Sequence, residues 1–116
     1  MYGRIYGRMV RTNTVMDKRD AINVAQRFAK VVQSQYGAAR FILFGSYAKG
    51  TFHEDSDIDV AVIFDNCEDE FHRDVELMRL GCDIDWRIEP HSFRASDFVA
   101  DDPLAYEVMK YGREIV

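Results

Sequence analysis

With 116 residues, of which 47% are hydrophobic, the chain suits one compact domain, and no apolar run approaches the ~20 residues that cross a bilayer. The formal net charge of -5 argues against direct binding to a nucleic-acid backbone, which calls for clustered lysine and arginine. Cys67 and Cys82 are too few for a disulfide scaffold, and we expect them to be reduced thiols of a cytoplasmic protein.

Residues 1–15 show neither a helical nor a strand period, and they carry basic residues without any acid. We expect a flexible N-terminal arm, or an extension upstream of a natural start at Met16. The remaining residues, 16–116, contain no internal repeat, low-complexity tract or linker, and they predict a single folded domain.

The first half of the folded part predicts the order helix, strand, strand. Asp17 can cap a helix in which apolar residues recur at spacings of three and four until Gly37, the expected stop. Two short apolar runs, over 41–44 and 58–64, are typical of buried strands. The segment over 45–56 is rich in glycine and serine and predicts a loop with one helical turn.

The second half predicts the order helix, strand, helix. We expect inward-facing residues at helical spacing, namely Phe71, Val75 and Met78, with Leu77 as a further candidate. The expected elements are a helix over 68–80 that Gly81 ends, a strand over 83–88 that Pro90 closes, a helix from Asp102 to Gly112, and an edge strand over 114–116. The order indicates an α/β fold: a short, mixed, twisted sheet flanked by helices, with the active site on one edge of the sheet.

Asp57 and Asp59 stand at the start of the second expected strand. Successive strand residues point to opposite faces, so residues at i and i+2 project the same way. Two carboxylates on one face repel each other unless a cation lies between them, and hard divalent cations, above all Mg²⁺, prefer oxygen ligands. The pair therefore predicts a metal site.

A third carboxylate is expected on the third strand. Asp85 lies between the apolar residues Ile84 and Trp86, and on a strand beside the second it would reach the same metal site. Asp83 shares its face and is the alternative third ligand. Three carboxylates on adjacent strands suit a site with two metal ions, one that activates a hydroxyl group and one that holds phosphates.

Gly45 and Ser46 come directly after the first strand. Glycine lets the backbone approach a phosphate closely, and the serine hydroxyl and nearby N–H groups can donate hydrogen bonds to phosphate oxygens. The pair is therefore a candidate for binding the phosphates of a nucleotide.

The run GSYAKGTFHEDSDID, from Gly45 to Asp59, resembles the G-S-x10-D-x-D signature of the DNA polymerase β-like nucleotidyltransferase superfamily. The preceding helix, the chain length and the later I-D-W run resemble the minimal branch of that superfamily, over roughly residues 17–116. The resemblance implies a nucleotidyltransferase fold for the domain over 16–116. It also implies transfer of AMP from ATP to a hydroxyl group, with two Mg²⁺ ions.

Carried over by position, the resemblance implies phosphate contacts at Gly45 and Ser46 and metal-binding catalytic carboxylates at Asp57, Asp59 and Asp85. Lys49 is a further candidate for nucleotide binding, at a position where the family often has arginine. Lysine keeps the charge but lacks the bidentate guanidinium, so its phosphate contact would be less directional.

The minimal branch resembles the antitoxin half of toxin–antitoxin pairs, whose partner is a HEPN-type ribonuclease toxin. The resemblance implies AMP transfer to a tyrosine of that toxin. The sequence leaves both a homo-oligomer and a hetero-oligomer open. The chain leaves no room for a second domain that would bind a primer, a tRNA or an antibiotic, so we expect the acceptor to come in trans. Two alternatives stay open: a non-enzymatic antitoxin that occludes its partner, and a small-molecule nucleotidyltransferase acting on an antibiotic.

Overall fold

The computed structural model describes residues 16–37, 39–65 and 69–116. The expected arm over 1–15 lies outside these residues, as do Cys67 and the expected helix start at Glu68. The elements in chain order are α1 (Lys18–Tyr36), β1 (Arg40–Phe44), α2 (Ser46–Lys49), β2 (Ile58–Phe64), α3 (Glu70–Ile84), β3 (Ile88–Arg94), the 3-10 turn η1 (Ala95–Asp97), α4 (Pro103–Tyr111) and β4 (Arg113–Glu114). None of the helices in the described part of the chain is long and apolar enough to cross a membrane.

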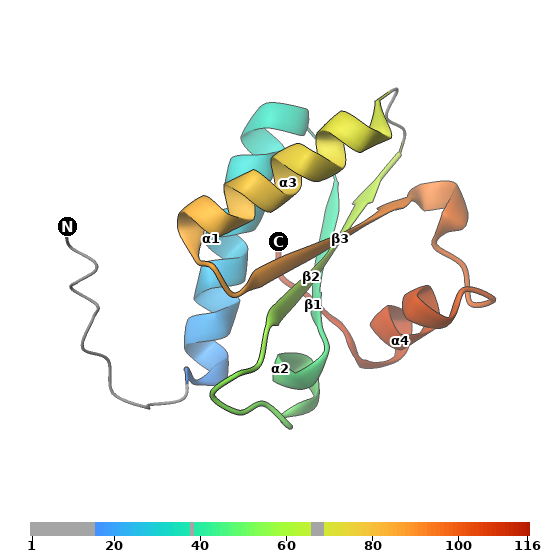
Figure 1. Cartoon of the computed structure of the whole chain (residues 1–116). Coiled ribbons are helices and arrows are strands. Elements are labelled where there is room, and N and C mark those ends of the chain that lie inside the picture. The colour runs from blue at the N-terminus through green and yellow to red at the C-terminus, as the bar shows by residue number, and fades with distance from the viewer. Residues whose placement is uncertain (1–15, 38, 66–68) are drawn as a thin grey trace.

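The four strands form one mixed sheet in the order β3-β2-β1-β4 (Figure 1). β1 pairs antiparallel with both β2 and β4, whereas β2 pairs parallel with β3. A parallel pair needs a crossover connection, and α3 supplies it. The predicted fold class, a short mixed sheet flanked by helices, is confirmed.

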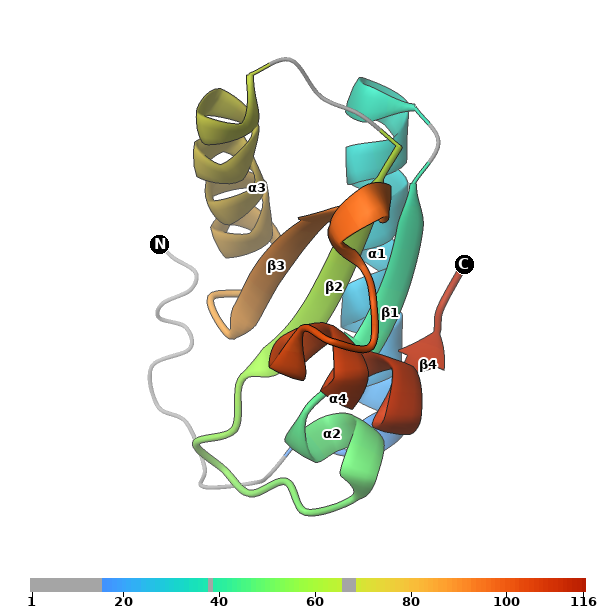
Figure 2. The same cartoon turned by 90° about the vertical axis from the view of Figure 1, so that its right-hand side faces the viewer.

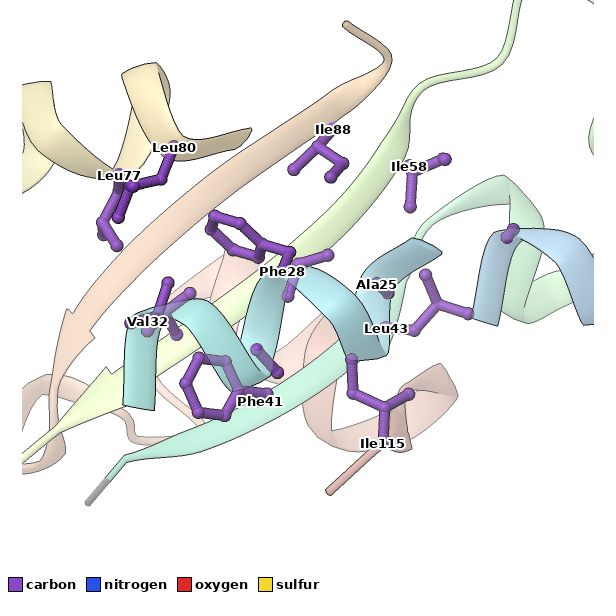
Figure 3. Close-up of a cluster of buried hydrophobic side chains, with 14 of the residues drawn as sticks. Ala25, Phe28, Val32, Phe41, Leu43, Ile58, Leu77, Leu80, Ile88 and Ile115 are labelled. Atoms are coloured by element: carbon purple, nitrogen blue, oxygen red, sulfur yellow. The ribbon is translucent and has the colours of Figure 1, made fainter. Parts of the chain in front are cut away.

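Helices cover both faces of this sheet (Figure 2). On one face, α1 and α3 enclose the larger core, in which Phe28 and Leu77 pack with Leu43 and Val60 of the strands (Figure 3). On the other face, α4 packs the residues Ala105 and Val108 on a smaller cluster that includes Ile42, Phe44, Ala61, Ile63 and Phe93. The core between the sheet and α4 is therefore smaller than the core between the sheet and the helices α1 and α3.

Several elements begin and end where the sequence predicts. The Asp17 carboxylate accepts a hydrogen bond from the Asp20 N–H at 2.8 Å and caps α1, and Gly37 at φ 80° ends that helix. β2 spans the predicted residues 58–64. Asp102 caps α4, as expected, with its carboxylate accepting from the N–H of Leu104 and Ala105.

The predicted strand over 83–88 is wrong. α3 continues through Gly81 to the end of its last turn, Asp85 is its C-terminal cap, and the strand follows as β3. A Cβ on Gly81 would lie only 3.0 Å from Ile88 Cγ2, so glycine at this position lets α3 approach β3 closely. Pro90 lies inside β3 instead of closing a strand, at the edge of the described sheet, where a missing N–H is tolerated.

The inward face of α3 also differs from the prediction. The residues expected to face inward are exposed: Phe71, Val75 and Met78. Leu77, the further candidate, is buried as expected, and Leu80 enters the core beside it. Arg73 also occupies a buried position, with its guanidinium carbon 4.3 Å from the centroid of the Phe64 ring. A buried arginine on this face makes the true inner stripe look polar in the sequence.

Candidate active site

The starts of β2 and β3 bring two carboxylates and an imidazole together. Asp59 lies opposite Glu89 in the parallel register, and His91 follows two residues later on the same face of β3. One ligand atom from each of these residues lies within 4.8 Å of the other two. His91 Nε2 is 3.1 Å from Asp59 Oδ1 and 3.9 Å from Glu89 Oε1. We call Asp59, Glu89 and His91 the acidic cluster.

The pleat of the sheet places the acidic cluster on the α4 face, which Asp59 shares with Ala61. The His91 ring packs edge-on against the Phe44 ring, with 5.0 Å between centroids. The side chains of Asp59 and His91 are mostly buried, whereas that of Glu89 is half-exposed. The cluster therefore rests on an apolar floor and opens to solvent at Glu89.

Gly45 gives the Asp59 carboxylate its room. Phe44, the last residue of β1, lies opposite Asp59 in the antiparallel register. Gly45 follows Phe44 directly and therefore lies beside the Asp59 carboxylate. Gly45 has φ +75°, and a Cβ on it would overlap Asp59 Oδ2. Both the backbone conformation and the close approach therefore require glycine.

Ser46 and Lys49 begin and end the short helix α2. The Ser46 carbonyl accepts a hydrogen bond from the Thr51 N–H at 3.0 Å, and the residue is partly exposed. Lys49 Nζ lies 3.6 Å from Glu107 Oε2 and 5.0 Å from the centroid of the Tyr111 ring, so this side chain is directed toward α4. Its contact with a nucleotide stays a prediction.

The loop between α2 and β2 is held at both ends. Tyr47 is buried and stacks on Phe52 with 4.6 Å between ring centroids. Near the other end, the hydroxyl of the buried Ser56 accepts a hydrogen bond from the His53 N–H at 2.9 Å. The exposed Asp57 follows Ser56 directly and precedes β2, two residues before Asp59, but its carboxylate is not one of the groups that meet in the acidic cluster.

Neither predicted third carboxylate belongs to the acidic cluster, where Glu89 lies beside Asp59. The Asp85 carboxylate accepts hydrogen bonds from Nε and Nη2 of Arg87, both at 3.0 Å, and from the Arg87 backbone N–H. Asp83 pairs with Arg79 on the surface of α3 at 3.0 Å.

The pKa values of Asp85 and Glu89 are shifted in opposite directions. Burial raises the pKa of Asp85, but the hydrogen bonds and charge of Arg87 outweigh it and leave that pKa below its usual range. Burial raises the pKa of Glu89, His91 opposes the rise, and the hydrogen bond and charge of Asp59 add to it. The hydrogen bond to Asp59 raises the pKa of His91 against the effect of burial. The charge of Asp85 is thus neutralised by an arginine, whereas the surroundings of Glu89 disfavour its charged form.

The donor set of the acidic cluster fits a hard divalent cation. Asp59 and Glu89 present carboxylate oxygens to one another across the register, and their charges repel in the absence of a cation. Oxygen donors of this kind are the ligands that Mg²⁺ prefers, and His91 adds a ring nitrogen at the same place.

Sequence reasoning missed Glu89 and His91. The run over 88–91 alternates between apolar and polar residues, which places these two polar side chains on one face of a strand. The expectation that Pro90 closes the strand hides this signal, because it removes the residues after Pro90 from the sheet.

A family model of the nucleotidyltransferase domain matches residues 25–100, well over half of the chain. No curated protein matches the chain at a significant level.

Solved structures share the fold. A toxin–antitoxin crystal structure with AMP-PNP is 26% identical, with a TM-score of 0.62 over 79% of this chain and 72% of that one. A mutant of the toxin–antitoxin MntA-HpeT is also 26% identical, with a TM-score of 0.60 over 78% and 70% of the two chains. A proposed nucleotidyltransferase from Sulfolobus solfataricus, 19% identical, has a TM-score of 0.58 over 84% and 80%. At that identity, the last likeness concerns the fold alone.

Proposed function

The chain belongs to the nucleotidyltransferase domain family and is therefore a transferase. From this premise we propose that it transfers AMP from ATP to a hydroxyl group: the hydroxyl oxygen bonds to the α-phosphorus, the bond to the β-phosphate breaks, and pyrophosphate leaves. One observation carries the proposal: Gly45, the expected phosphate-binding glycine, lies directly against the Asp59 carboxylate of the acidic cluster. Phosphates bound at this turn would meet the carboxylates through a divalent cation, because anions and carboxylates otherwise repel.

In this proposal Mg²⁺ is held by three carboxylates, those of Asp57, Asp59 and Glu89. Glu89 takes the place for which the sequence predicts Asp85. When bound, the cation neutralises phosphate charge and makes an acceptor hydroxyl easier to deprotonate. Ser46 donates its hydroxyl hydrogen to a phosphate oxygen, and His91 holds the Asp59 carboxylate through their contact at 3.1 Å. The number of ions, two in the sequence prediction, belongs to the same proposal.

The acceptor, in this proposal, belongs to a toxin protein, for which the chain acts as antitoxin. Two similar structures, each 26% identical, are reported as toxin–antitoxin structures, and one of them holds AMP-PNP. The sequence resemblance adds that the toxin is a HEPN-type ribonuclease and that the modified hydroxyl is a tyrosine. The net charge of -5 agrees with a protein partner better than with RNA.

The test mixes the chain with the protein encoded beside its gene, ATP and Mg²⁺, and weighs that protein by intact mass spectrometry. One or more AMP units should appear, on a tyrosine by peptide mapping, and Asp59→Asn should remove them. Asp65→Asn is the matched control, since Asp65 is an exposed aspartate just after the opposite end of β2. It should transfer AMP at the native rate.

The same experiment separates the alternatives. If Asp59→Asn neutralises the toxin fully and no mass is ever added, the chain acts by occlusion and the enzymatic proposal is wrong. If the toxin is untouched while ATP is consumed with an aminoglycoside, the acceptor is a small molecule.

A further inference from the structure

α3 has two apolar faces, and the core accounts for one of them. Leu77 and Leu80 are buried against the sheet and α1. The outer residues Phe71, Val75 and Met78 are 74%, 52% and 54% exposed. Figure 2 shows α3 at the outside of the molecule, beside β3.

The outer apolar residues form one continuous stripe. Their spacings of four and three residues keep them on one side of a helix that turns about 100° per residue, and the exposed Cys82 continues the same side one turn later. We call Phe71, Val75 and Met78 the outer stripe. Helix α1 differs, because its exposed positions are polar or charged apart from Tyr36. Scattered apolar residues are normal on surfaces, but a contiguous stripe marks an interaction site.

A hollow continues the outer stripe toward the sheet edge. Met78, Leu77 and Asp74 line one wall, and Pro90 and Ser92 of the edge strand β3 line the other, around a volume of about 140 Å³. The stripe is thus extended by a groove between a helix and a strand edge.

A larger hollow of about 500 Å³ adjoins this groove and shares Asp74 and Ser92 with it. Its charged lining consists of four carboxylates and two guanidinium groups, those of Glu70, Asp74, Asp97, Asp102, Arg73 and Arg94. Arg94 pairs with Glu70, and Arg73, buried over the Phe64 ring, lies 3.6 Å from the Asp74 carboxylate, which leaves Asp97 and Asp102 as the excess carboxylates. The lining therefore keeps an excess of negative charge, which favours a cationic side chain as occupant.

We propose that the outer stripe and the acidic hollow form the docking surface for a helix of the toxin partner. Apolar residues of that helix, spaced by three and four, cover Phe71, Val75 and Met78, and an arginine or lysine beside them enters the hollow. This inference rests on the proposed function, to which it adds the place where the partner binds.

A second copy of the chain fits this surface less well. A twofold dimer pairs the same patch of both subunits, so it would bring the two acidic hollows near one another. Like charges that face each other across an interface lower affinity. A basic, apolar helix meets both parts of the surface without that cost.

The surface lies away from the acidic cluster. Asp59 and Glu89 stand at the starts of their strands on the α4 face, whereas the larger hollow is lined by residues from Ser92 onward and by α3. Substitutions at the surface should therefore weaken binding of the toxin and raise its KM, with kcat unchanged.

The test measures affinity for the protein encoded beside the gene, by isothermal titration without ATP, in the Asp59→Asn background. The triple variant Phe71→Gln, Val75→Gln, Met78→Gln should bind about tenfold or more weakly. All three side chains are exposed, so folding should persist, as circular dichroism can check. The comparison variant, Tyr106→Gln with Met109→Gln, changes similarly exposed apolar residues of α4, the rival surface. Native or nearly native affinity in this variant, with lost affinity in the triple variant, supports the outer stripe, and the reverse result overturns the inference.

The hollow is tested by Asp74→Asn with Asp97→Asn. This variant should bind more weakly at low salt, and the difference should shrink as salt rises, because salt screens exposed charges. Native affinity in both the stripe and hollow variants would overturn the inference. So would a native chain that dimerises through the stripe, with the triple variant monomeric.

This test and that of the proposed function fail separately. Lost binding in the stripe variant supports the surface even where no AMP is ever transferred. AMP transfer by a stripe variant with native affinity and native KM overturns the surface and leaves the proposed function standing.

Discussion

Asp85 and Glu89 lie four residues apart on either side of Arg87, and the fold uses them in opposite ways. Asp85 caps α3 and receives two hydrogen bonds from the Arg87 guanidinium, which lowers its pKa against the effect of burial. Glu89 lies in β3 opposite Asp59, and its pKa is raised by burial and by that carboxylate. We therefore propose that Asp85, already neutralised by an arginine, stabilises the fold, and that Glu89, held against another carboxylate, is the one available to a cation.

The largest expected difference between the two positions is in catalysis. Glu89→Gln removes a proposed metal ligand and should slow AMP transfer by about 100-fold or more. Asp85→Asn should stay within about tenfold of the native rate, since the Asp85 carboxylate is already paired with the Arg87 guanidinium. Initial rates on the toxin, at matched amounts of folded protein, measure both. A strong loss in Asp85→Asn with native activity in Glu89→Gln would restore Asp85 as the third carboxylate.

The next effect concerns the glycine that gives the cluster its room. Gly45→Ala should abolish the enhancement of ATP binding by Mg²⁺ and lower the free energy of unfolding by about 1–3 kcal/mol, because of positive φ and overlap with Asp59. Gly50→Ala is the matched control, with φ +83° and nothing within 4 Å of its Cβ. Gly50→Ala should also lower the free energy of unfolding, because of its positive φ, but it should keep Mg²⁺-enhanced ATP binding in isothermal titration. Equal loss of ATP binding in both variants would contradict a role for the overlap.

The sequence predicts one part of the acidic cluster, Asp59, and misses the other part, which β3 supplies, for a physical reason. Gly45 and Asp59 are joined by a local loop of fixed spacing, so the pattern alone places them at neighbouring strand ends. Glu89 reaches Asp59 through a parallel register that depends on where α3 ends. Gly81 reads locally as a stop, but α3 runs past it, and glycine there lets the helix pack closely on Ile88, a tertiary contact. The same holds for the faces of α3, where Leu77 is buried and Val75 is exposed although periodicity favours Val75.

A smaller effect is expected on stability at Asp85. Its pKa is lowered by folding, so the pair with Arg87 stabilises the fold above the unfolded pKa of about 3.8, and the contribution is lost as pH falls through the folded pKa. Asp85→Asn should lower the free energy of unfolding by about 1–3 kcal/mol at pH 7, since it leaves a mostly buried guanidinium without its counter-ion. The difference from the native protein should fade in denaturant titrations below about pH 4. Asp83→Asn, at an exposed pair with Arg79, should change stability by less than about 0.5 kcal/mol.

The smallest expected effect is the change in stability when Glu89 is replaced in the metal-free protein. The sign of this change tests whether Glu89 and Asp85 have different roles. Glu89→Gln removes a charge that faces Asp59, so the metal-free variant should be as stable as the native protein or slightly more so. Because the side chain is half-exposed, solvent screens the repulsion and the change should stay within about 0.5 kcal/mol.

Mg²⁺ should reverse the order of stability of the native protein and Glu89→Gln. It binds the native fold and stabilises it by mass action, and it should raise the melting temperature of Glu89→Gln less. Asp85→Asn should be less stable than the native protein with and without Mg²⁺, and should keep the native Mg²⁺ shift. Thermal melts of the three proteins at increasing Mg²⁺ measure all of this. If Glu89→Gln melts well below the native protein without metal, the charge of Glu89 stabilises the fold, as that of Asp85 does, and the division between the two carboxylates is wrong.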